Sequence, residues 1–112
     1  MQNKIKQSVG TLFAHIIKVD HRDVDKSVPL FCDLMGQNFD CTHAEVTTFL
    51  YDIMDREYDL DAHIDIIKQA LAEDRISKFH ILEQLNHIIY SGKITPDDYK
   101  FFEDIKNRLF ES

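Results

Sequence analysis

The chain contains few of the residues that interrupt regular secondary structure. Among its 112 residues there are three glycines and two prolines. A protein built from many short strands needs more turns than these residues can provide, so the composition favours long helices. No segment has the alternating pattern of a strand, and there is no glycine-rich phosphate loop.

Cysteine is scarce as well, since Cys32 and Cys41 are the only two. Two cysteines in a chain with ample apolar residues do not indicate a disulfide scaffold, and we expect two reduced, partly buried thiols. Cys32 lies between Phe31 and Asp33 and has no basic neighbour that would favour its thiolate form. We therefore predict no catalytic residue.

Positive charge is in deficit. The chain has 13 Lys and Arg against 20 Asp and Glu, which gives a formal net charge of −7. Binding to nucleic acid requires clustered basic side chains, and the sequence has no such cluster. We expect neither nucleic acid nor an anionic membrane surface as a partner, whereas a basic protein or a cation would suit this charge.

Long apolar runs are absent too. The segment Met1–Lys6 lacks the apolar core of a signal peptide, and no stretch approaches the roughly 18 apolar residues that indicate a membrane-spanning helix. We expect no direct insertion into a membrane and a cytoplasmic location.

Apolar residues are nevertheless abundant enough for one hydrophobic core. They make up 44% of the chain and include eight Phe and four Tyr. A length of 112 residues suits a single domain, residues 1–112. Apolar residues recur at helical spacing, which predicts an all-α bundle of about six helices. The expected helices cover approximately residues 3–19, 28–35, 42–53, 60–71, 74–90 and 95–109.

Several residues are expected to set the ends of these helices. Asp25 or Ser27 is the predicted N-cap of the second helix, and Gly36 is its predicted left-handed closing residue. Thr42 is followed by a Glu three residues later, which predicts a capping box. Thr95 is followed by a proline and two acids, which also marks a helix start.

Two parts of the chain resemble each other. His15-Ile16-Ile17 recurs as His87-Ile88-Ile89, and in both places a polar loop and an apolar-striped helix follow. The sequence therefore predicts two similar helix-loop-helix units that enclose a middle pair of helices.

The loop of the first unit is rich in carboxylates. Asp20, Asp23 and Asp25 could supply oxygen ligands to a divalent cation, with Asp98 completing the site if the two loops lie close together. An EF-hand is excluded, because Val28 stands where the sixth position of that loop requires glycine. In the alternative interpretation these acids cap helices and face water.

Histidines suggest a second kind of metal site. His80, Glu83 and His87 share one helix face, and imidazole with carboxylate suits zinc or iron. That face lies opposite the apolar one, so exposure to solvent is the alternative. His63 lies within an apolar arc, where we expect a buried imidazole bonded to a backbone carbonyl.

The arrangement of helices and loops resembles the TerB-like (tellurite-resistance B) family of small all-helical domains, from about Lys6 to Phe110. Each half of that family typically has an Ala-Asp-Gly loop, with a Glu seven residues after the Asp. In this chain the corresponding residues are Val19-Asp20-His21 with Ser27, and Tyr90-Ser91-Gly92 with Asp98. Asp20, Gly92 and Asp98 match the family in character, whereas His21, Ser27 and Ser91 depart from it.

The resemblance implies a role in stress response and tellurite resistance, through protein assemblies and metal or acidic-surface contacts, without an established reaction. We therefore expect a cytoplasmic interaction module whose acidic loop surface binds another protein or a divalent cation. Two alternatives stay open: a metal-dependent enzyme with His and carboxylate ligands, and a purely structural protein-binding module. Homo-oligomerisation is left open as well.

Overall fold

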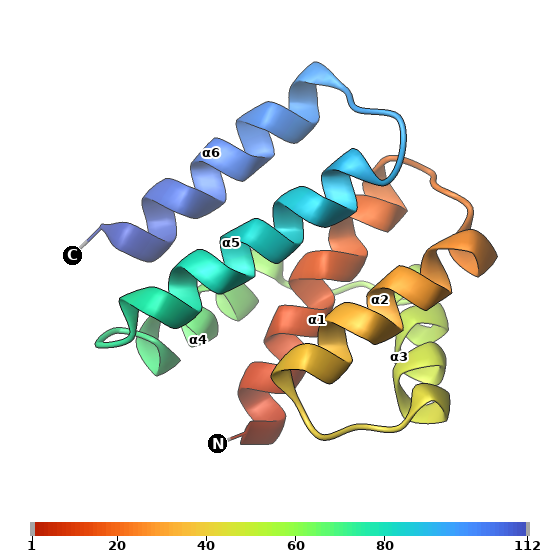
Figure 1. The fold of residues 1–112 in the computed structure, drawn as a ribbon. Helices are drawn as coiled ribbons and strands as arrows, with labels where there is room; N and C mark the ends of the chain where they lie inside the picture. The colour runs from red at the N-terminus through yellow and green to blue at the C-terminus, as the bar shows by residue number, and fades with distance from the viewer. Residues whose placement is uncertain (1, 112) are drawn as a thin grey trace.

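The computed structural model describes residues 2–111, and within them it contains six α-helices and no strand (Figure 1). This confirms the predicted all-α class. The helices are α1 (Gln2–Val19), α2 (Val24–Asn38), α3 (His43–Asp55), α4 (Leu60–Ala70), α5 (Arg75–Tyr90) and α6 (Pro96–Phe110). None of the described helices is long and apolar enough to cross a membrane.

Helix α1 lies near the centre of the bundle, where it packs against α2, α3, α4 and α5. The helices α5 and α6 form an antiparallel hairpin along one side (Figure 1). The core is a single cluster of apolar side chains from all six helices. Its fully buried members include Val9, Leu12, Phe13, Leu50, Ile53, Ile67, Leu85, Ile105 and Leu109.

Side chains that accept hydrogen bonds from free backbone N–H groups begin five of the helices. Thr42 and Thr95 form capping boxes with Glu45 and Asp98, which confirms both predicted helix starts. Asp59 and Asp74 cap α4 and α5, each by accepting a bond from the N–H three residues later, and Asp23 does the same for α2.

Both predicted ends of α2 were wrong. Its N-cap is Asp23 rather than Asp25 or Ser27, so the helix begins earlier than predicted and Pro29 lies in its second turn. The helix also continues past Gly36 to Asn38, and no glycine in the described chain has a positive φ. Asn38 donates a 2.7 Å hydrogen bond to Gln84 on α5, so a contact between helices supports the last turn.

Two other expectations were wrong. The helical spacing of the apolar residues from Phe79 to Ile89 predicts that Phe79 is buried with the others, but it is 53% exposed. The Nδ1 atom of His63 is 2.9 Å from the hydroxyl of Ser8 on α1, so its partner is a side chain and not a backbone carbonyl. His15 bonds the hydroxyl of Tyr58 in a similar way, at 2.7 Å.

Candidate functional site

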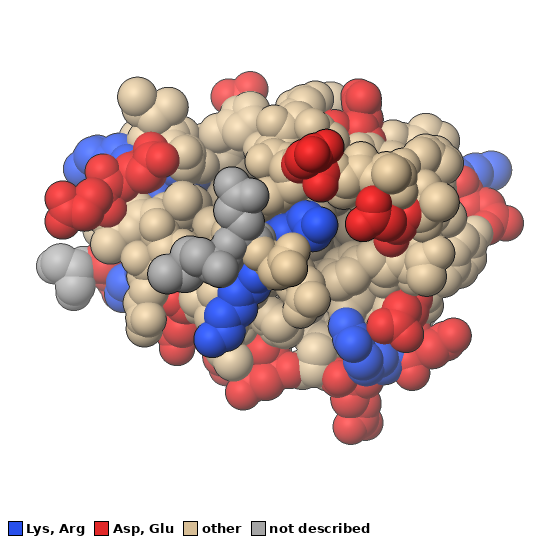
Figure 2. Space-filling model, turned by 90° about the horizontal axis from the view of Figure 1, so that it is seen from below, with Lys and Arg blue, Asp and Glu red and all other residues tan. Residues whose placement is uncertain are grey.

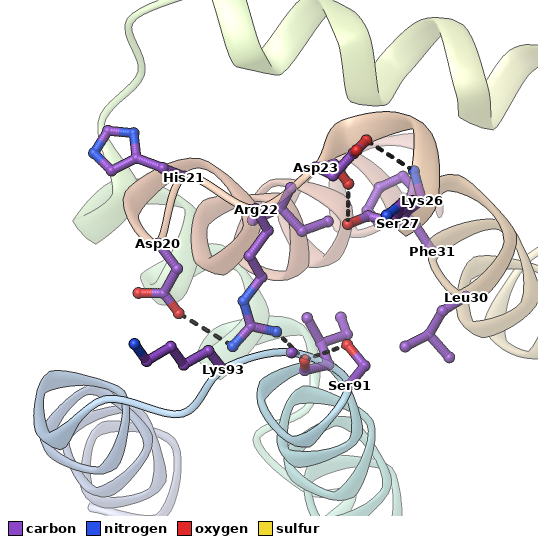
Figure 3. A pocket seen from close by; sticks show the side chains of 13 residues that line it. Asp20, His21, Arg22, Asp23, Lys26, Ser27, Leu30, Phe31, Ser91 and Lys93 are labelled. Carbon is purple, nitrogen blue, oxygen red and sulfur yellow. Dashed lines mark hydrogen bonds and ion pairs between the residues drawn. The ribbon is translucent and has the colours of Figure 1, made fainter.

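The loops of the two predicted helix-loop-helix units lie at the same end of the molecule (Figure 1) and next to each other (Figure 3). Arg22 extends from the first loop to the C-terminal end of α5. Its guanidinium donates hydrogen bonds to the backbone carbonyls of Ile88 and Ile89, the latter at 2.9 Å. One side chain therefore joins the segment after α1 to the segment before α6. The similarity of the two helix-loop-helix units stays a prediction.

Arg22 is also the shared counterion of two carboxylates. Its Nη2 atom is 3.1 Å from Asp20 and 3.6 Å from Asp98, and the three side chains are 9%, 10% and 2% exposed. Burial raises the pKa of Asp20, the nearby Asp98 carboxyl raises it further, and Arg22 acts in the opposite direction. The two acids can be buried together because the guanidinium neutralises part of their charge.

Gly92 makes room for this cluster. A Cβ atom added to residue 92 would lie 3.0 Å from the guanidinium carbon of Arg22 and 3.1 Å from its Nε. Nε is also the one buried side-chain polar atom in the described chain that lacks a hydrogen-bond partner. The glycine is therefore needed for the close approach of the guanidinium and not for a left-handed backbone.

The left-handed backbone occurs instead at His21, whose φ is 52°. The N–H of His21 bonds the carbonyl of Lys18, and the N–H of Arg22 bonds the carbonyl of Ile17. These two bonds form a Schellman motif, the usual way to end a helix with one left-handed residue. The motif directs the chain so that Arg22 points toward the second loop.

A pocket of about 370 Å³ lies between the two loops and the start of α2. Apolar and charged side chains both line it, among them Leu30, Phe31, Lys26 and Lys93. Within the described chain, no carboxylate lies within ion-pair distance of Lys26 or Lys93. The pocket thus offers an apolar wall and two exposed ammonium groups to a ligand or a partner side chain.

The four predicted metal ligands do not come together as one group. Asp20 and Asp98 meet at Arg22, Asp23 caps α2, and Asp25 accepts a hydrogen bond from the hydroxyl of Tyr51. In the region that the structure describes, no three His, Cys, Asp or Glu side chains are grouped so that they could hold a metal ion. The divalent-cation site stays a prediction. In the structure the positive charge beside Asp20 and Asp98 is the guanidinium of Arg22.

His80, Glu83 and His87 are exposed and line a shallow groove between α5 and the end of α2. Their exposure agrees with the interpretation of this face as solvated. The sequence analysis did not predict a role for Arg22, although this residue follows Asp20 by two positions in the same loop. Its partners at the end of α5 are 66 and 67 residues away, so no local signal could identify them.

Figure 2 shows one face of the molecule, on which acidic and basic side chains are interspersed with uncharged surface. Comparison of the chain with models of protein families, with curated proteins and with solved structures finds no match.

Proposed function

We propose that this protein is a TerB-like interaction module that binds a partner protein at the surface formed by residues 20–27 and 91–93, which we call the two-loop face. The observation that carries the proposal is the set of bonds from Arg22 to both halves of the chain. A surface whose parts are already fixed loses little conformational entropy on binding. The pocket in this face can accept one partner side chain, and Lys26 and Lys93 can contact its charged groups.

The low exposure of two polar pairs supports binding rather than catalysis, since Ser8 is buried and the other three members are half-buried. Ser8 and His63 are the nearest approach to a nucleophile and base, but Ser8 is 0% exposed and no substrate could reach it. His15 packs against the rings of Tyr58 and Phe101, and burial raises the pKa of Tyr58, which disfavours its reactive phenolate form.

Affinity capture from cells of the source organism tests this proposal. The chain is used as bait alongside a Lys26→Glu/Lys93→Glu variant and a matched Lys100→Glu/Lys106→Glu variant. Lys100 and Lys106 are exposed on α6 and do not line the pocket, so the control makes the same charge change elsewhere. We expect one partner to be captured by the wild type and by the control, and to be lost with the pocket variant and at high salt. Retention by the pocket variant would contradict the proposal.

A divalent cation at the same face is the second candidate, favoured by the close approach of the Asp20 and Asp98 carboxyl groups. The ion would have to take the place of the Arg22 guanidinium between them. Calorimetric titration with calcium, manganese and zinc tests this, with Asp20→Asn as the comparison. Binding that weakens at least tenfold in the variant would support the site, and the absence of binding heat would exclude it. The metal-dependent enzyme requires the same ions and depends on the same result.

The role in tellurite resistance and stress response, implied by the resemblance, is proposed on the same basis. A strain that lacks the gene would be grown on potassium tellurite with the wild-type chain or with the Lys26→Glu/Lys93→Glu variant. We expect only the wild-type chain to restore growth. Equal growth of the deletion strain and its parent would contradict this role.

A further inference from the structure

An apolar surface lies at the end of the α5–α6 hairpin that is remote from the two-loop face (Figure 1). Ile76 in the first turn of α5 is 84% exposed, and Phe79 one turn later is 53% exposed. The Phe79 ring packs against Phe110 near the end of α6, with 4.7 Å between ring centroids. The buried face of α5 consists of other residues, so Ile76 adds nothing to the core. Ile76 and Phe79 are three residues apart on one helix and thus expose apolar side chains on the same side, a feature found at interaction sites.

Two basic side chains border this surface. The guanidinium carbon of Arg75 is 5.5 Å from the Phe110 ring centroid, and Nζ of Lys78 is 5.3 Å from it. Neither forms an ion pair or a side-chain hydrogen bond with any residue that the structure describes. Lys78 as a whole is only 7% exposed, but its Nζ is not fully buried, so its alkyl chain is covered while its ammonium group reaches solvent. Both cations can therefore form an ion pair with a carboxylate of another molecule.

We propose that Ile76, Phe79, Phe110, Arg75 and Lys78, together the α5 patch, bind an acidic amphipathic helical segment of a partner protein. Apolar side chains of the segment would cover Ile76 and Phe79, as in other complexes in which a helix lays its apolar face on an apolar surface. Glutamates or aspartates beside them would pair with Arg75 and Lys78, and such charge-assisted hydrogen bonds are stronger than neutral ones.

The charges favour this occupant over a second copy of the chain. A symmetric dimer places the same patch of both copies face to face. Arg75 and Lys78 would then lie near the like charges of the other copy. The net charge of −7 does not prevent an acidic segment from binding, because charges beyond about 8 Å are largely screened at physiological salt.

Single-stranded nucleic acid fits less well. Base stacking requires an aromatic ring with a free face, whereas Phe79 and Phe110 pack on each other and the most exposed residue is aliphatic. The chain also lacks the series of basic residues that would follow a phosphate backbone.

Two synthetic helical peptides provide the test. Both carry leucines at the same helical spacing, and their polar positions are glutamate in one and lysine in the other. Each is titrated into the full ¹⁵N-labelled chain and followed by NMR. We expect the glutamate peptide to bind at least tenfold more tightly than the lysine peptide and to shift the amide signals of residues 75–79.

Ile76→Asp and Arg75→Glu are the test variants, with Tyr90→Asp as the matched control. Tyr90 is also exposed, at 55%, but lies at the other end of α5. We expect each test variant to bind the glutamate peptide with at least tenfold lower affinity than the wild type. The control should bind it with unchanged affinity. Ile76 is so exposed that its replacement should not disturb folding, which circular dichroism would verify.

Several results would overturn the proposal: equal binding of both peptides, glutamate-peptide binding that survives Ile76→Asp, or tighter binding of a thymidine oligonucleotide. Self-association in sedimentation experiments that disappears in Ile76→Asp would assign the patch to a second copy. The Lys26→Glu/Lys93→Glu variant should bind the glutamate peptide like the wild type, so the outcome is independent of the two-loop face.

Discussion

The guanidinium of Arg22 packs directly against Gly92, with 3.0 Å between its central carbon and the place that a Cβ of residue 92 would occupy. Three carbonyl or carboxylate groups within hydrogen-bond distance hold that guanidinium, so it has little freedom to move aside. The fit between the two loops therefore depends on the absence of a side chain at residue 92. This dependence can be measured.

Replacement of Gly92 by alanine should destabilise the protein. Overpacking of a well-packed site typically costs 1–3 kcal/mol, and we expect a loss of about 1.5 kcal/mol in the free energy of unfolding. Gly36→Ala is the matched control, since Gly36 lies inside α2 with no atom within 4 Å of an added Cβ. That change should stabilise by about 0.5–1 kcal/mol, because alanine is the better helix former. Urea unfolding of both variants would compare them, and equal effects would contradict this account of Gly92.

Removal of Arg22 should cost considerably more. Arg22→Ala leaves Asp20 and Asp98 buried without their counterion, and breaking such a buried pair costs about 3 kcal/mol or more. Arg56→Ala is the control, because Arg56 and Asp52 form an exposed pair whose loss should cost under about 1 kcal/mol.

The loss in free energy of unfolding caused by Arg22→Ala should become smaller as the pH falls from 7 to 5. Without the guanidinium, which acts to lower the pKa of Asp20, that pKa rises further above its unfolded value. The folded variant then binds a proton more readily than the unfolded chain, so acid stabilises it relative to the wild type. Unfolding curves at both pH values measure the effect. A loss of stability that becomes larger toward pH 5 would contradict the role of Arg22 as the counterion of Asp20.

Replacement of His21 by glycine should stabilise the protein. A non-glycine residue in the left-handed region costs roughly 1–2 kcal/mol, and glycine removes that cost at the C′ position of α1. We expect a gain of about 1 kcal/mol, which is reduced because glycine also has more freedom in the unfolded chain. His21→Ala retains the unfavourable backbone and should bring no gain. Thermal unfolding of the pair separates the effect of the backbone from the loss of the imidazole.

Stability should decrease as the pH falls below about 6.5. Burial lowers the pKa of His15 from its ordinary value of 6.5, with Lys18 contributing, and burial with Arg56 does the same for His63. The unfolded chain therefore binds more protons than the folded one in this range. The free energy of unfolding consequently decreases as the pH decreases. The measurement is a series of unfolding curves from pH 8 to pH 6, above the titration of most carboxyl groups. A His15→Gln/His63→Gln double variant should flatten the dependence, and an unchanged slope would assign it to other groups.

The sequence was sufficient for the helices because their signals are local. Apolar spacing defined the six segments, and Thr42 and Thr95 were recognised as caps because each bonds a residue three positions away. The start of α2 had a local signal that was missed, since Asp23 accepts a bond from the N–H three residues later, whereas the end of α2 was missed because a longer-range contact supports it. Asn38 is held by Gln84, 46 residues later, and a glycine at position 36 does not end a helix whose last turn has such a partner.

The candidate site was predicted in part. The proximity of the two loops was anticipated as a condition for joining Asp20 to Asp98, and the structure brings these two acids together. The residue between them was not anticipated, because an arginine side chain can reach many positions and its spacing along the chain does not reveal its partners. Phe79 illustrates the opposite error. Its spacing fits the apolar arc of α5, but α5 extends one turn beyond the core at its beginning.

The last turn of α5 depends on a side chain that precedes it by 66 residues. Carbonyl groups at the C-terminal end of a helix lack partners within the helix, and Arg22 supplies hydrogen-bond donors and a positive charge there. Closing a loop of this length costs entropy that is recovered only as native packing forms. We therefore expect the end of α5 to become ordered late in folding, together with the first loop, so that the two halves of the chain fold as one cooperative unit.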